Sequence, residues 1–123
     1  MKRLIRASVP FGSLLVSACL MSACHSYHIE TTIKNETGAP ISLVEVDYPS
    51  ASFGADAVAA SGDFHHRIQT RGSGPLKVQY TNASGKQVQI TGPTLYEGQE
   101  GRLEIDLLPD GKAKFDPILN PAH

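Results

Sequence analysis

Beyond residue 24, apolar residues recur at every second position in short segments, and this alternation constrains the fold more than any other feature. In "ISLVEVDY", Val44, Val46 and Tyr48 alternate with Glu45 and Asp47. Because successive side chains of a β-strand point to opposite faces, a period of two predicts strands with one buried and one solvated face. No stretch keeps the 3.6-residue period of an amphipathic helix. The sequence therefore predicts an all-β domain.

The alternation marks about seven short strands, separated by clusters of Gly, Pro, Asn, Asp and Ser. Ile41 and Leu43 are out of phase with Val44 and Val46, so a β-bulge or strand bend is expected near Leu43. Strands that each have one apolar face favour two antiparallel sheets packed face to face. The expected strands cover residues 27–34, 41–48, 63–70, 75–81, 86–91, 101–107 and 112–115.

The pattern resembles that of Ig-like β-sandwiches, a common arrangement for a domain of this size. The segments "IKNETGAPISLVEVDY" and "VQYTNASGKQV" also look like the asparagine–turn–strand rhythm of small Ig-like domains on bacterial envelope proteins. A transthyretin-like sandwich or a small barrel fits the alternation as well. We therefore expect a single antiparallel sandwich over residues 29–116, followed by a C-terminal tail at residues 117–123.

The first 23 residues have the layout of a secretory signal peptide. "MKRLIR" is basic, and the following "ASVPFGSLLVSACLMSA" is apolar and uncharged. That apolar part has 17 residues and contains Pro10 and Gly12, whereas a membrane-spanning helix usually needs about 20 apolar residues. The segment predicts export followed by removal of residues 1–23.

The end of this segment resembles the lipobox of bacterial lipoproteins, in which a small residue immediately precedes an invariant cysteine. "VSAC" ends at Cys19 and "MSAC" ends at Cys24. We favour Cys24 because polar residues begin directly after it, whereas apolar residues follow Cys19, which remains the alternative. The resemblance implies cleavage before Cys24, diacylglycerol on its thiol, acylation of its new amino group, and a short tether at residues 24–28. Because His25 rather than Asp follows, it also implies an outer-membrane location facing the periplasm if the organism is Gram-negative.

The charge balance and the residue inventory exclude several function classes. Lys2, Arg3 and Arg6 are the only charged residues before Glu30, so the exported part has eight basic and 12 acidic residues. A mildly acidic domain lacks the basic surface that nucleic-acid binding needs. No serine lies in a nucleophile-elbow pattern, so neither an enzyme nor a cofactor is expected. The leading expectation is a non-catalytic module that binds, or structurally supports, another envelope protein or a cell-wall component.

A stretch of small residues at 49–63 is too long for a simple turn, and it is expected to be a loop. Long loops in compact domains often carry function. This one is either a crossover between the two sheets or a partner-contact loop that uses Ser52, Phe53 and Asp56.

The histidines raise an alternative function, a periplasmic protein that binds copper or zinc. His65 and His66 are adjacent on an expected strand, so their side chains point to opposite faces and do not readily share one ion. His66 is in phase with Phe64 and Ile68, and we expect it in the core.

Overall fold

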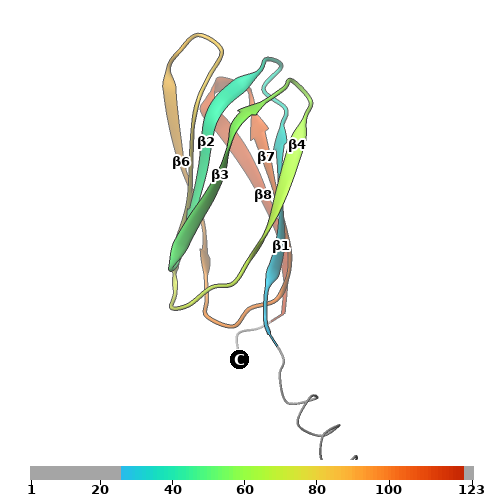
Figure 1. Cartoon of the computed structure of the whole chain (residues 1–123), viewed down its shortest axis with the longest axis vertical. Coiled ribbons are helices and arrows are strands. Elements are labelled where there is room, and N and C mark those ends of the chain that lie inside the picture. The colour runs from blue at the N-terminus through green and yellow to red at the C-terminus, as the bar shows by residue number, and fades with distance from the viewer. Residues whose placement is uncertain (1–25, 121–123) are drawn as a thin grey trace, which may run out of the picture.

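The structure is a computed structural model that describes residues 26–120, in which two four-stranded sheets pack face to face (Figure 1). The all-β antiparallel sandwich predicted from the alternation is confirmed, with eight strands in place of about seven. The strands are β1 (Ile29–Asn35), β2 (Ile41–Tyr48), β3 (Ala51–Val58), β4 (Asp63–Ile68), β5 (Gly74–Thr81), β6 (Gln87–Leu95), β7 (Gly101–Leu108) and β8 (Lys112–Leu119), and a short 3-10 turn (Pro109–Gly111) joins the last two.

The two sheets draw strands from both halves of the chain. Sheet A has the order β4-β1-β7-β8 and sheet B the order β3-β2-β5-β6. Strands β1 and β7 are parallel, and all other neighbouring pairs are antiparallel. Strands β1, β3, β5 and β7 all run away from the end where β1 begins. The four turns that follow them therefore lie at the opposite end of the sandwich (Figure 1).

The core lies between the sheets and is built from the apolar phase of each strand. In β7, for example, Leu103, Ile105 and Leu107 are buried while Arg102 and Glu104 are not. This is the alternation that the sequence predicted. The buried apolar side chains are Ile29, Ile33, Ile41, Val44, Val46, Val58, Ile68, Leu76, Val78, Tyr80, Leu95, Leu103, Ile105 and Leu107.

The expected irregularity near Leu43 is confirmed as a break in register. The pairing of β2 with β5 shifts between Ser42 and Glu45, and Leu43 has a positive φ of 51°. The side chain of Leu43 is 66% exposed. Opposite this bulge, Gly54 of β3 approaches β2 so closely that a Cβ atom would lie 2.1 Å from the carbonyl oxygen of Val44. The bulge thus requires glycine on the neighbouring strand.

Residues 49–63 do not form the expected loop, because most of them belong to β3, which pairs with β2. The strand was missed because its alanine, serine and glycine residues have low β-propensity and give little alternation. It forms at the edge of sheet B, where one row of hydrogen bonds to β2 is enough to hold it.

The C-terminal boundary expected at residue 117 is also wrong, because β8 continues to Leu119. Pro117 lies opposite Leu103 in this strand. A proline cannot donate a backbone hydrogen bond, so it suits an edge strand that has a partner on one side only. Strand β8 is such an edge, and the proline therefore does not end it.

Aromatic side chains close the long edge where β3 of one sheet faces β4 of the other. The ring centroid of Phe53 lies 6.2 Å from that of Tyr48 and 6.1 Å from that of Phe64. At the opposite edge, Phe115 of β8 lies so near Gly92 of β6 that a Cβ there would be 2.7 Å from its ring. Each open side of the sandwich is therefore sealed by phenylalanine.

Candidate functional site

Cys24 and the alternative Cys19 lie outside the described residues, as does the segment 1–23. Among residues 26–120, no helix is long and apolar enough to cross a membrane. Ile29, where β1 begins, is only five residues beyond Cys24 in the sequence.

The three residues expected in a partner-contact loop lie instead on strand β3. Ser52 and Asp56 are exposed, and Phe53 is half-buried and packs against the core. They line a shallow hollow of about 340 Å³ together with Leu43 and Gly54 at the bulge. The prediction of a loop was wrong, and these residues belong to an accessible edge of sheet B.

The two candidate metal ligands lie on β4, and His66 is not in the core as expected. Both histidines are exposed. The ring of His66 stacks on Phe53, with centroids 4.6 Å apart and planes inclined by 13°. Strand β4 lies at the edge of sheet A, so residues of its inward phase can meet solvent beside the small residues of β3. Within the described residues, no group of three His, Cys, Asp or Glu side chains could hold a metal ion.

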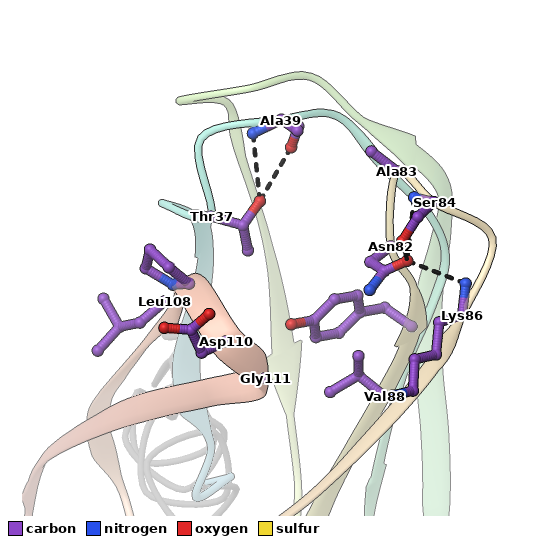
Figure 2. A pocket seen from close by; sticks show the side chains of 12 residues that line it. Thr37, Ala39, Asn82, Ala83, Ser84, Lys86, Val88, Leu108, Asp110 and Gly111 are labelled. Carbon is purple, nitrogen blue, oxygen red and sulfur yellow. Dashed lines mark hydrogen bonds between the residues drawn. The ribbon is translucent and has the colours of Figure 1, made fainter.

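A cleft of about 620 Å³ lies at the end of the sandwich opposite the start of β1, where three turns converge (Figure 2). The β1–β2 turn provides Thr37 and Ala39, and the β5–β6 hairpin provides Asn82 and Lys86. The β7–β8 turn provides Asp110, and Figure 2 shows its carboxylate and the Lys86 side chain on opposite walls.

The first wall of the cleft is held by Asn35, the last residue of β1, which is fully buried. Its Nδ2 donates to the carbonyl oxygens of Ala39 (2.8 Å), Val58 (3.1 Å) and Ala59 (3.1 Å). Its Oδ1 accepts from the backbone N–H (3.1 Å) and the hydroxyl (2.7 Å) of Thr37. One side chain thus fixes both the β1–β2 and the β3–β4 turns.

The second wall, at the surface, is likewise held by hydrogen bonds to the side chain of an asparagine. Oδ1 of Asn82 accepts from the backbone N–H groups of Ser84 (3.1 Å) and Lys86 (2.9 Å), and from the Ser84 hydroxyl (2.9 Å). The third wall contains Asp110 and Gly111, which adopt positive φ values of 65° and 70°. Asp is among the few residues that tolerate this conformation as a single residue, so "PDGK" suits the turn.

Tyr80 forms the floor of the cleft. The residue is 2% exposed and lines the cleft, and its hydroxyl makes no hydrogen bond to any described residue. Burial raises the pKa of the Tyr80 phenol above its usual value. The uncharged phenol can both donate and accept a hydrogen bond.

The polar groups that remain available in the cleft are mixed in sign. Tyr80, Nδ2 of Asn82 and the Lys86 ammonium can donate, and the Asp110 carboxylate can accept. The hydroxyls of Thr37 and Ser84 are already engaged within their own turns. The cleft therefore offers donors and an acceptor to a polar group. The sequence showed each of these turns but carried no signal that they would meet.

A separate polar row crosses the outer face of sheet B. Nε2 of Gln79 donates to Oε1 of Glu45 (3.3 Å), and Nε2 of Gln89 donates to Oε1 of Gln79 (3.3 Å). Glu45 and Asp47 lie on the same face of β2, and hydrogen bonding and charge repulsion from Asp47 raise the pKa of Glu45 above its usual value of 4.5. The folded protein therefore holds a proton on Glu45 more tightly than the unfolded chain does.

This carboxyl pair predicts a pH-dependent stability. As the pH rises from about 4.5 through the raised pKa of Glu45, the folded state loses stability relative to the unfolded state. Asp47→Asn removes the interaction, so we expect it to increase stability near neutral pH and to flatten the pH profile. Denaturant unfolding at several pH values measures this, with Asp63→Asn on β4 as the charge-matched control. Equal profiles for Asp47→Asn and the wild type would contradict the assignment.

The fold has a relative among solved structures, but sequence comparison finds none. No protein-family model matches the chain, and a search of curated proteins gives no match. A protein from Eubacterium rectale, whose structure was determined by NMR, superposes with a TM-score of 0.54 over 72% of this chain and 86% of that chain. The two sequences are 12% identical. This similarity concerns the fold alone: the chain is a β-sandwich with a solved structural relative.

Proposed function

We propose that this protein is a small lipid-anchored protein of the bacterial envelope whose sandwich is a non-catalytic binding module. The observation that carries the proposal is the position of the cleft relative to the start of β1. Strand β1 begins at one end of the sandwich, and the turns that line the cleft lie at the other (Figure 1). A lipid on Cys24 would hold the first end at the membrane and direct the cleft toward another envelope component.

The length of the tether supports this orientation. Residues 24–28 span at most about 18 Å when fully extended, so the start of β1 would stay close to the lipid surface. Strand β1 then runs about 23 Å toward the cleft. Each buried methylene of an acyl chain contributes roughly 0.8 kcal/mol, and two or more chains give stable anchoring. In a Gram-negative cell, the proposed site is the periplasmic face of the outer membrane.

The chemistry of the cleft supports binding rather than catalysis. Lys86 and Asp110 offer opposite charges across a cavity of about 620 Å³, with Tyr80 beneath them. The volume is within the range of known ligand pockets. The partner in this proposal is an envelope protein or a cell-wall component with polar groups of both signs.

The anchor is tested by Cys24→Ser in the full-length protein. We expect this variant to lose the acyl mass and to leave the membrane fraction, because serine cannot form the thioether. Intact mass spectrometry and fractionation measure both effects. Cys19→Ser is the matched control and should behave like the wild type. A Cys24→Ser protein with wild-type mass and membrane fractionation would refute the anchor, and loss on Cys19→Ser alone would move it to Cys19.

The cleft is tested in the same anchored protein with a photo-crosslinking residue at Ala83, an exposed position in the lining. The control carries the crosslinker at Gln69, which is exposed beyond β4 at the other end of the sandwich. We expect discrete adducts at position 83 that weaken several-fold on Asp110→Asn, which removes the charge but suits the same turn. Equal adducts from both positions, or no effect of Asp110→Asn, would contradict a specific site.

A further inference from the structure

Each sheet of the sandwich has two edge strands, and one of the four edges differs from the others. An edge strand presents unpaired backbone N–H and C=O groups, and proteins usually protect it with charged residues, especially Lys, or with Pro. Strand β4 carries Asp63 and Arg67, β6 carries Pro93, and β8 carries Lys112 and Pro117 among other charges. Strand β3, with the sequence "ASFGADAV", has no Lys, Arg or Pro.

The unprotected strand is long and accessible. Strand β3 has eight residues, and its side chains are mostly exposed except for Phe53, Ala55 and Val58. It pairs with β2 on one side only, so every second residue directs its N–H and C=O groups away from the sheet. The small side chains leave this row of backbone groups open to another strand. Such an edge is suited to pairing by strand addition.

We propose that two copies of this chain pair antiparallel through β3 about a two-fold axis at Gly54, joining two B sheets into one. In this register Ser52 of one copy lies opposite Asp56 of the other, twice by symmetry. The hydroxyl of Ser52 can then donate to the carboxylate of Asp56 on the outer face. On the inner face, the large Phe53 lies opposite the small Ala55, also twice.

The complementarity of this register identifies the occupant as a second copy. The only charged residue of the strand, Asp56, meets a neutral donor, whereas an axis at residue 56 would place two aspartates opposite each other, which destabilises a sheet. Opposite residues in a continued sheet must share a face. The inner faces of both copies therefore stay inward only when the two-fold axis passes through a residue rather than between two residues.

The expected strength follows from the size of the contact. Pairing one strand from each copy buries less than the roughly 1,200–2,000 Å² of a standard stable interface, so dimers are weak in dilute solution. Confinement to one membrane raises the effective concentration of the two partners. The dimer itself does not depend on the lipid anchor, so it can be tested in full-length protein whether or not Cys24 is modified.

The experiment is disulfide trapping with Ser52→Cys/Asp56→Cys in the full-length chain, oxidised in extracts of expressing cells and resolved on non-reducing gels. Positions 52 and 56 are exposed and about 13 Å apart along one strand, which is too far for a disulfide within a chain. Across the proposed axis they are direct neighbours. We expect at least ten-fold more disulfide-linked dimer than in the wild type, whose own cysteines set the background.

Matched variants separate this register from random collision. In the single variants Ser52→Cys and Asp56→Cys, identical positions lie about 13 Å apart across the axis, so both should stay at background, while a mixture of the two should give mixed dimers. Asp63→Cys/Arg67→Cys places the same spacing on the edge of β4 and should also stay at background. Dimer formation equal in the single variants or on β4, linkage only to a different protein, or no linkage in any variant would overturn the proposal.

Discussion

Replacing Asn35 by alanine is expected to lower the free energy of unfolding by about 3–5 kcal/mol, the largest effect we predict for a single polar residue. The side chain is fully buried and serves three carbonyl oxygens and two donors of Thr37. A buried polar group left without a partner costs roughly 1–3 kcal/mol. Alanine leaves several such groups without a partner at once, and only those near the surface of the turn can form hydrogen bonds with water instead.

Denaturant unfolding of full-length protein measures this loss, and Asn82→Ala is the matched control. Asn82 also begins a turn, and its Oδ1 accepts three hydrogen bonds where that of Asn35 accepts two, but the donors to Asn82 lie in an exposed hairpin. Water can replace those bonds, so we expect Asn82→Ala to cost only about 1 kcal/mol. Similar losses for the two variants would show that burial of the Asn35 network does not stabilise the fold as proposed.

The burial also means that Asn35 is inaccessible as a glycosylation acceptor in the folded domain, although "NET" matches the sequon.

Gly54→Ala is the second large prediction, with an expected loss of about 3 kcal/mol or more. The added Cβ would lie 2.1 Å from the carbonyl oxygen of Val44 and 3.2 Å from its carbonyl carbon. Both atoms belong to the backbone of β2, so no side-chain rotation relieves the contact. The pair of strands must separate locally, and that breaks hydrogen bonds beside the bulge at Leu43.

The control for this prediction is Gly74→Ala at the start of β5. A Cβ at Gly74 would meet only the Pro49 side chain, at an ordinary 3.6 Å, and φ at this position is not positive. Replacing glycine at a compatible position usually stabilises a protein by about 0.4–1 kcal/mol through the unfolded state. Thermal and denaturant unfolding of both variants gives the comparison. A Gly54→Ala protein within about 1 kcal/mol of the wild type would contradict the close approach of β3 to β2.

Strand positions were predictable wherever large apolar residues alternate with polar ones. The phase of Leu103, Ile105 and Leu107 gave the buried face of β7 correctly, and the phase break at Leu43 predicted the bulge. Strand β3 was missed because Ala and Gly give no such contrast. The position of His66 was predicted wrongly because its phase points inward, whereas its strand lies at an edge where the interior meets solvent. The phase of the apolar residues can be read from one segment of the sequence, whereas the position of a strand at a sheet edge depends on which other strands pair with it.

The candidate site was even less predictable from the sequence than the strand positions. The turns "NETGAP", "NASGK" and "PDGK" were visible in the sequence as turns. That they form the walls of one cleft follows from the strand order, in which residues far apart in the chain become neighbours. The roles of Asn35 and Asn82 were likewise hidden, because both stand in similar turn sequences and only one is buried.

The sequence by itself determined the all-β class, the inward face of most strands and the places where the chain turns, because these depend on side-chain hydrophobicity and local backbone preference. It also supplied the resemblance to a signal peptide and lipobox on which the anchor proposal rests. Only the tertiary structure decided which strands are neighbours, which edges stay open and which turns share a cleft. Those features depend on how two sheets bury a common core, and that is a property of contacts between segments rather than of any segment alone.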